Sequence, residues 1–362
     1  MKASLFCTAR YMGPAPHDIW PLAADTFSGE VAQRSMETTF EQFRCADEFG
    51  FDWVTTAEHH YSAFSLTPNP MVMAGALTQV VKRAKIAVLG PTIPILNPVR
   101  VAEEFAMLDT MSGGRVVAGM LRGTPNEYVT YNINPSESRE RFAEALHLIR
   151  RAWTEQQPFG WLGRYYQYRA IAIWPRPVQK PHPPIYMSGS SPEAGEFAAK
   201  NRIGIGFAFT TVPMAKKAVQ HYRAVAHGDG WDPPPDQVIY RAMFHVAESD
   251  EQAFADLSAL PPRVALTDQN AAISEAVKDT SYYGSQLQEQ SQRNARRELS
   301  DRIELGQVIV GSPETALKQV RRIRDELGAG ILDLVVGAQL GDKTLRSIEL
   351  FGTKVLPRMR EL

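Results

Sequence analysis

The stretch I-A-V-L-G-P-T-I-P-I-L-N-P-V-R-V-A-E-E-F-A-M-L-D-T-M-S-G-G-R-V-V-A-G-M, from Ile86 to Met120, contains one complete strand–helix–strand unit. Its first residues, Ile86–Leu89, form a short apolar run that predicts a buried strand. Asn97-Pro98 predicts a helix start, because Asn caps free backbone N–H groups and Pro fits the first turn. Gly113-Gly114 ends the helix, and Val116–Met120 is a second apolar run. This order predicts two parallel strands joined by a helix.

The same unit recurs along the chain. Short apolar or β-branched runs predict eight strands, at residues 3–8, 51–56, 86–89, 116–120, 184–187, 203–208, 238–246 and 331–336. Helical patterns follow them, and the last runs from about 343 to 356. Eight alternating units favour a closed (β/α)₈ TIM barrel over an open sheet. We therefore expect residues 1–362 to form a single barrel domain.

Two segments exceed the minimal repeat. Residues 155–183 form an excursion rich in Pro and aromatic residues, and residues 250–305 form a long insertion rich in Gln and charged residues after the seventh strand. Long segments of this kind are uncommon unless they serve as lids or binding loops. We expect residues 250–305 to form extra helices and a lid.

Bulk composition narrows the class of protein. The chain has 39 Lys and Arg against 40 Asp and Glu, so neither nucleic acid nor an anionic membrane is the expected partner. Its two cysteines exclude a disulfide framework and favour a reducing, cytoplasmic setting. No apolar run reaches the length of a membrane span, and neither G-x-G-x-x-G nor a P-loop occurs.

Polar residues follow several predicted strands, where barrel enzymes carry their chemistry. Ser190 and Ser191 precede a helix whose free N–H groups and dipole can hold a phosphate, with Arg122 as the counter-charge. An ordinary capped helix, with Arg122 paired to a loop carboxylate, explains the same residues. The candidates at these strand ends are Glu58, His59 and His60, then Leu89 and Gly90, then Arg122, and then Ser188, Gly189, Ser190 and Ser191.

The adjacent histidines His59 and His60 raise three alternatives. A metal site is not expected, because neighbours in an extended segment point to opposite sides and no third ligand converges. One imidazole can face the pocket while the other supports it from outside, with Glu58 bonding locally. The remaining alternative is a histidine with an ordinary structural role.

Six motifs together resemble the bacterial luciferase-like flavin-dependent monooxygenases. They are T-A-E-H-H-Y-S, N-P-V-R-V-A-E-E, L-D-T-M-S-G-G-R, G-M-L-R-G, R-P-V-Q-K-P-H-P-P-I-Y-M-S-G-S-S-P-E-A and G-S-P-E-T-A, in that order. The resemblance implies a barrel that binds FMN at its mouth. It also implies that FMNH₂ comes from a separate flavin reductase and activates O₂ as a flavin peroxide, which oxygenates a small organic substrate.

The resemblance also assigns roles. His59 matches the histidine beside the reactive part of the flavin, and Glu58 matches the acid that supports it. Arg122, Ser190 and Ser191 match the residues that meet the phosphate. Leu89-Gly90 matches a bulge under the flavin ring, where many members carry a non-proline cis peptide. Pro125 departs from the family pattern, so contacts at the ring edge are open.

Aromatic residues predict a partly apolar substrate pocket. The candidates are Phe6, Thr8, Tyr61, Phe64, Phe207 and Phe209. We also expect a homodimer. Three other functions remain open: a deazaflavin-dependent hydride-transfer oxidoreductase on the same barrel, a non-catalytic flavin-binding barrel, and a metal-dependent hydrolase.

Overall fold

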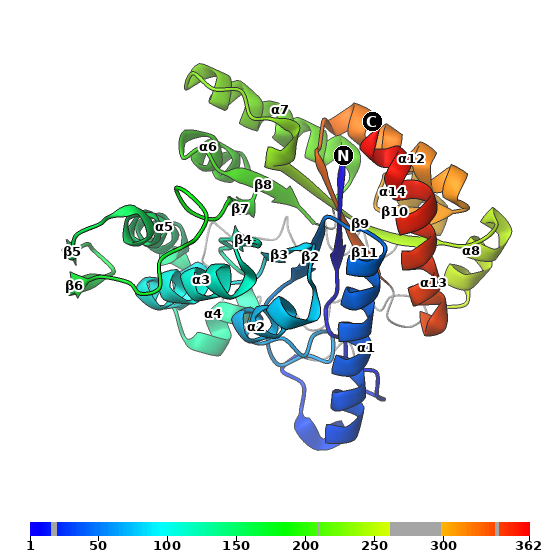
Figure 1. Ribbon diagram of the computed structural model, residues 1–362, viewed down its shortest axis with the longest axis horizontal. Coiled ribbons are helices and arrows are strands. Elements are labelled where there is room, and N and C mark those ends of the chain that lie inside the picture. Colours follow the sequence, from blue (N-terminus) through cyan, green and yellow to red (C-terminus); the bar gives the residue numbers. More distant parts are fainter. Residues whose placement is uncertain (16–19, 209, 261–297, 337–339) are drawn as a thin grey trace.

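Eight parallel strands close into a barrel in the computed structural model, which describes residues 1–15, 20–208, 210–260, 298–336 and 340–362 (Figure 1). Around the ring the strands are β1 (Lys2–Phe6), β2 (Trp53–Thr56), β3 (Lys85–Val88), β4 (Val116–Gly119), β7 (Ile185–Ser188), β8 (Gly204–Phe207), β9 (Val238–Val246) and β11 (Ile331–Val336). The pairing of β8 with β9 closes the ring. The predicted (β/α)₈ barrel and all eight predicted strands are confirmed.

Helices surround this barrel and return the chain from each strand to the next (Figure 1). They are α1 (Gly29–Glu48), α2 (Pro70–Val80), α3 (Pro98–Ser112), α5 (Ser138–Thr154), α6 (Pro192–Lys200), α7 (Val212–Gly228), α12 (Pro313–Leu327), α13 (Asp342–Leu350) and α14 (Leu356–Arg360). The capping predictions hold for α3: the Asn97 side chain accepts from the N–H groups of Val99 and Arg100, and Gly113 ends the helix with φ of 66°.

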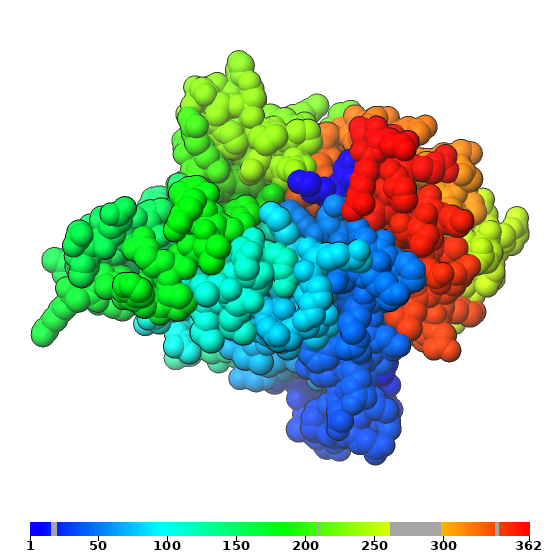
Figure 2. Space-filling model, in the orientation of Figure 1, coloured from blue at the N-terminus to red at the C-terminus, as the bar shows by residue number. Residues whose placement is uncertain are grey.

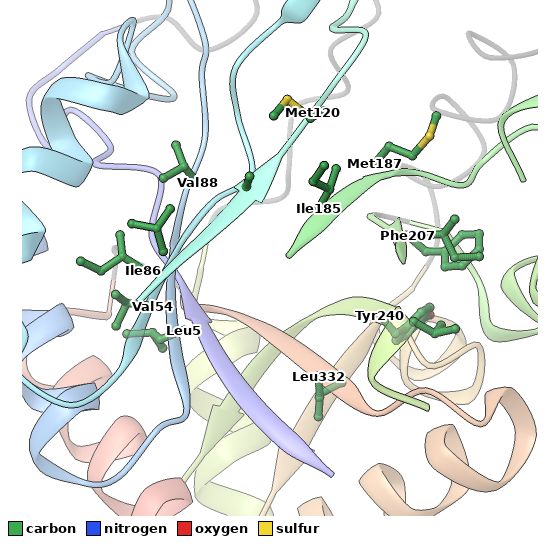
Figure 3. Packing of buried hydrophobic residues seen from close by; sticks show 14 of the residues in the cluster. Leu5, Val54, Ile86, Val88, Met120, Ile185, Met187, Phe207, Tyr240 and Leu332 are labelled. Carbon is green, nitrogen blue, oxygen red and sulfur yellow. The ribbon is translucent and has the colours of Figure 1, made fainter. Parts of the chain in front are cut away.

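Most of the apolar core lies between the strands and the helices. Outward-facing residues of neighbouring strands, such as Leu5, Val54 and Ile86, stack there in one layer (Figure 3). Because residues in a strand alternate in direction, the intervening residues point to the barrel axis. Within the barrel, Trp53 meets the ring of Tyr186 edge-on, with centroids 5.6 Å apart.

Strand β8 contributes almost nothing to the inside of the barrel. A Cβ atom at Gly204 would overlap the Tyr186 ring, so the glycine makes room for that large neighbour. The interior is therefore filled by large side chains facing small ones.

Three pieces were not predicted. Strands β5 (Phe159–Leu162) and β6 (Gln167–Ile171) form an antiparallel hairpin in the 155–183 excursion, which projects from one end of the molecule (Figure 2). Strand β10 (Val308–Gly311) pairs with the end of β9, outside the eight-strand ring. Helix α4 (Pro125–Tyr131) follows β4.

Part of the predicted insertion is visible. Helices α8 (Asp250–Ser258) and α11 (Leu299–Glu304) lie at its two ends. Residues 261–297 lie outside the described residues, so the predicted lid stays a prediction. Among the helices that the structure does describe, none is long and apolar enough to cross a membrane.

Asp47 joins α1 to the start of β3. Its carboxylate accepts from the backbone N–H groups of Lys82, Arg83 and Ala84 at 2.9, 3.0 and 2.7 Å. Burial would raise the pKa of Asp47, but these three bonds and the Arg83 charge outweigh it and lower the pKa. The ionised carboxylate therefore stabilises the fold.

We predict that Asp47→Asn lowers the free energy of unfolding at pH 7 by about 1–3 kcal/mol, because one amide loses its acceptor. A lowered carboxyl pKa stabilises the fold above the unfolded pKa, about 3.9, and this contribution is lost as pH falls through the folded pKa. The gap between wild type and variant, measured by urea unfolding, should narrow below about pH 4. The exposed Asp25→Asn serves as control, and equal stability of both variants would contradict the prediction.

Candidate active site

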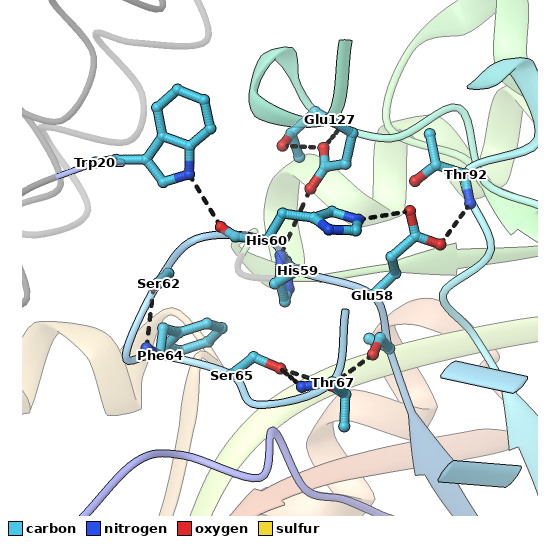
Figure 4. A network of polar contacts seen from close by, with 12 residues as sticks. Trp20, Glu58, His59, His60, Ser62, Phe64, Ser65, Thr67, Thr92 and Glu127 are labelled. Atoms are coloured by element: carbon cyan, nitrogen blue, oxygen red, sulfur yellow. Dashed lines mark hydrogen bonds and ion pairs between the residues drawn. The ribbon is translucent and has the colours of Figure 1, made fainter. Parts of the chain in front are cut away.

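The loop after β2 sends its acid and its two imidazoles to different places (Figure 4). Glu58 is buried, and its Oε1 lies 3.1 Å from Nε2 of His60. The second oxygen, Oε2, accepts from the backbone N–H of Thr92 at 3.2 Å. Glu58 therefore binds its own loop to the loop after β3.

His60 is packed as a structural residue. It is buried, its carbonyl accepts from Nε1 of Trp20 at 3.0 Å, and its ring meets Tyr131 edge-on with centroids 5.2 Å apart. The site around it leaves no space for a ligand beside Nε2, which Glu58 occupies.

His59 faces the mouth of the barrel instead. Its side chain is 35% accessible, and its ring meets Phe64 edge-on with centroids 5.3 Å apart. Burial, followed by the charges of Arg241 and His60, lowers the pKa of His59 to about 4. The imidazole is therefore neutral at pH 7.

Glu127 is a site residue that the sequence reasoning missed. Its side chain is 2% accessible, its Oε1 lies 3.9 Å from Nδ1 of His59, and its Oε2 accepts from the Thr124 N–H at 2.6 Å. Burial raises the pKa of Glu127, the bonds from Thr124 offset part of this, and Glu58 raises it again. The signal was present, because T-P-N-E has the spacing of a capping box with Pro125 in the first turn.

Gly90 allows the loops after β2 and β3 to touch. A Cβ atom there would lie 2.6 Å from the Glu58 nitrogen and 2.7 Å from the Ala57 Cα, so only glycine fits. The Leu89-Gly90 bond is not among the cis peptide bonds of the described residues, all of which precede proline.

A second group of candidates lies at the ends of β4 and β7. Ser191 caps α6, its Oγ accepting from the N–H of Ala194 at 3.3 Å, and the Oγ atoms of Ser188 and Ser190 lie 3.0 Å apart. Gly189 packs under them, since a Cβ atom would lie 2.9 Å from Cβ of Ile205. Hydroxyl groups and a helix N-terminus therefore meet at one place.

Arginines add positive charge at the same helix start. Arg139, which the sequence reasoning did not single out, lies 3.5 Å from the Glu193 carboxylate. The helix-start N–H and the Ser191 hydroxyl lower the pKa of Glu193, and the charges of Arg139 and Arg122 contribute. Both arginines are therefore close to the N-terminus of α6, in an environment that favours anions.

The predicted substrate residues separate into distinct places. Phe64 lies beside His59, Phe6 is buried under the guanidinium of Arg241, and Tyr61 is exposed with φ of 53°. Phe207 is buried in the strand–helix core, and its ring reaches the backbone at Gly189, where a Cβ atom would lie 3.1 Å from its Cζ. Thr8 is partly exposed, and Phe209 lies outside the described residues.

Other features of the described surface do not add to this site. A cavity of about 360 Å³ is lined by His147, Arg150, Arg151, Thr154, Pro181 and His182, none of which is a predicted site residue. Within the described ranges, no three His, Cys, Asp or Glu side chains are placed to hold a metal ion.

The lowered pKa of His59 predicts a pH dependence of stability. The folded pKa of about 4 lies below the unfolded value of about 6.5. The folded protein therefore pays no cost for its neutral His59 above pH 6.5, and its free energy of unfolding decreases as pH falls from 6.5 towards 4. NMR titration of labelled histidines should show one ring, absent in His59→Gln, that stays neutral to about pH 5. A midpoint near pH 6.5 for that ring would contradict the prediction.

Comparison with known proteins places this barrel among flavin-associated relatives. The oxygenase component of flavin-dependent trigonelline monooxygenase from Acinetobacter baylyi is 26% identical over 234 residues, covering 62% of this chain and 64% of that protein. The 4-hydroxyprotoasukamycin monooxygenase of Streptomyces nodosus subsp. asukaensis is 25% identical over 345 residues, covering 91% and 88%. The chain spans 48–64% of the length of several relatives, the trigonelline enzyme included.

Solved structures share the fold. The oxygenating constituent of 3,6-diketocamphane monooxygenase from Pseudomonas putida, in complex with FMN, is 18% identical with a TM-score of 0.78, covering 99% of this chain and 98% of that chain. An F420-dependent secondary alcohol dehydrogenase is 19% identical with a TM-score of 0.71, covering 99% of both chains. A sequence profile described as luciferase-like monooxygenase matches residues 19–330, and the chain therefore belongs to the luciferase-like monooxygenase family.

Proposed function

We propose that this protein is the oxygenase of a two-component monooxygenase, which takes reduced FMN from a separate flavin reductase and uses O₂ to oxygenate a small organic substrate. One observation carries the proposal: serine hydroxyls and arginines at a helix N-terminus lie on the same barrel mouth as a neutral, accessible imidazole. Arg122 and the serines before α6 form the first, and His59 forms the second. Two relatives named for flavin or FMN, the trigonelline oxygenase component and the diketocamphane constituent, support it.

The strand ends between these two places suit a flat ring system. Glycines end β3, β4 and β7, at positions 90, 119 and 189, and a Cβ atom at each would lie within 2.9 Å of a neighbouring atom. Neighbouring strands and loops therefore pack closely against these three positions, which carry no side chain of their own. FMN, when bound, supplies the redox chemistry and the activation of O₂.

Arg122, Ser190 and Ser191 would hold the phosphate of FMN. The N-terminus of α6 offers free N–H groups and the positive end of its dipole, and Arg122 offers a planar pair of donors. Arg139 would add charge from α5. These groups bind and orient the cofactor at its polar end.

His59 would handle a proton at its imidazole. A neutral ring carries one N–H and one free lone pair, so it can accept a proton at one nitrogen and release one from the other. Glu127, which lies 3.9 Å from Nδ1 and has a raised pKa, is placed to exchange that proton. Glu58 and His60 hold the loop, and Phe64 covers one side of the ring against water.

A deazaflavin-dependent hydride-transfer enzyme is the second candidate. The observation that favours it is the F420-dependent dehydrogenase, which has the same barrel. Flavin binding without catalysis is less well supported, because binding alone has no need of an open imidazole beside the buried Glu127.

Arg122→Met should weaken FMN binding by about 10- to 100-fold, because a hydrogen bond to a charged group contributes about 1.5–3 kcal/mol. Riboflavin, which lacks the phosphate, should bind the variant and the wild type equally. Fluorescence titration of both flavins measures the difference, and the exposed Arg100→Met is the matched control. Equal losses for riboflavin and FMN would remove Arg122 from the phosphate site, and tight binding of deazaflavin alone would favour the second candidate.

The purified protein should oxygenate organic compounds only when a flavin reductase, NADH and FMN are added. Mass spectrometry should find one atom from ¹⁸O₂ in the product, with yield insensitive to catalase, and His59→Ala should lower the yield at least tenfold. Reduction of substrate without O₂ uptake, or full turnover of His59→Ala, would contradict the proposed chemistry or the role of His59, respectively.

A further inference from the structure

A guanidinium lies at the floor of the mouth, on strand β9. Arg241 is opposite Asp333 in the register of β9 and β11, and both point to the barrel interior. Its side chain reaches up one layer, so that Cζ lies 3.6 Å from the ring centroid of Phe6. The charge of Arg241 also lowers the pKa of His59, which places the guanidinium near that imidazole.

Asp333 satisfies only part of this guanidinium. Nε of Arg241 donates to Oδ2 of Asp333 at 2.7 Å, whereas Nη1 and Nη2 make no hydrogen bond with the residues that the structure describes. Asp333 is fully buried, and its Oδ1 has no hydrogen-bond partner there either. Because arginine has five donors in a planar fork, the Nη edge is left for another acceptor.

A second arginine borders the same place. Arg302, on α11, donates through Nη2 to the sulfur of Met243 at 3.0 Å, and a thioether is a weak acceptor. Burial lowers the pKa of Arg302, and no carboxylate within the described ranges pairs with it. Met243 is the next inward residue after Arg241 on β9 and packs against the cluster that contains Phe6, so it lies between the surroundings of the two arginines.

This spot combines a positive charge with an apolar floor. Phe6, Ala57, Val335 and Met243 form one small cluster there. Among the ion pairs of the described residues, Asp333 pairs with Arg241 and no carboxylate pairs with Arg302, so an added monoanion would balance the second charge. A planar carboxylate matches the arginine fork through two parallel hydrogen bonds, while an apolar body would rest on the cluster.

We propose that the substrate of this mouth carries a carboxylate, which binds to Arg241 with Arg302 as the second cation. The inference depends on the proposed function only in naming this ligand the substrate. The carboxylate and the FMN phosphate would then occupy different ends of the mouth, the floor and the rim at α6.

The test compares benzoate and hexanoate with benzamide and hexanamide, their neutral counterparts, as ligands of the flavin-free protein. At about ten times its Kd, a bound carboxylate should raise the melting temperature by roughly 1–4 °C, and the amides should raise it much less. Amides that act as strongly as carboxylates would overturn the proposal. The melting-temperature shift requires no turnover, so a negative result here can be distinguished from a failure of the proposed monooxygenase activity.

Variants then locate the bound anion. Arg241→Met leaves Asp333 buried without its partner, so the double variant Arg241→Met/Asp333→Asn keeps the interior neutral. It should bind benzoate at least tenfold more weakly, and Arg302→Met should lose about threefold or more. The exposed Arg34→Met, the matched control, should bind as wild type does.

Arg122→Met separates the floor from the rim. It should retain benzoate binding, and loss of that binding would place the anion at the phosphate end and overturn the proposal. If the double variant does not fold, Arg302→Met decides the question. Benzoate binding as tight as that of the wild type would overturn the proposal. Weaker benzoate binding with an unchanged melting temperature would support it.

Discussion

The two oxygens of Glu58 connect the loops that carry most of the site. One oxygen orients His60 and the other accepts from the Thr92 N–H, so the loops after β2 and β3 are fixed together. This bond and the missing side chain at Gly90 allow His59 alone to face the mouth. Glu58 and His60 therefore hold the two loops together, and His59 is the histidine of this segment that stays accessible.

Local signals made the barrel predictable from the sequence. Apolar runs and capped helix starts, such as Asn97 before α3, depend on nearby residues and were interpreted correctly. Strand β10 was missed because its partner β9 lies far away in the sequence, and the β5/β6 hairpin was missed because the Pro- and aromatic-rich segment 155–183 was interpreted as an irregular excursion.

The candidate site was predictable only where its residues follow a strand directly. His59, Arg122 and Ser191 meet that rule, and the structure places them at the mouth, where their roles stay predictions. Glu127 lies one short helix further on, and Arg241 lies inside a strand, where a long side chain reaches the mouth from below. A rule based on strand ends therefore misses residues such as Arg241, whose long side chain extends to the site from within a strand.

The contact between Gly204 and Tyr186 has an evolutionary consequence. Any larger residue at position 204 collides with the Tyr186 ring, and a smaller residue at 186 alone leaves a hole beside Trp53. Neither change is tolerated singly, so the two positions must change together. Substitutions at the rim do not meet this constraint, so changes there leave this part of the interior intact.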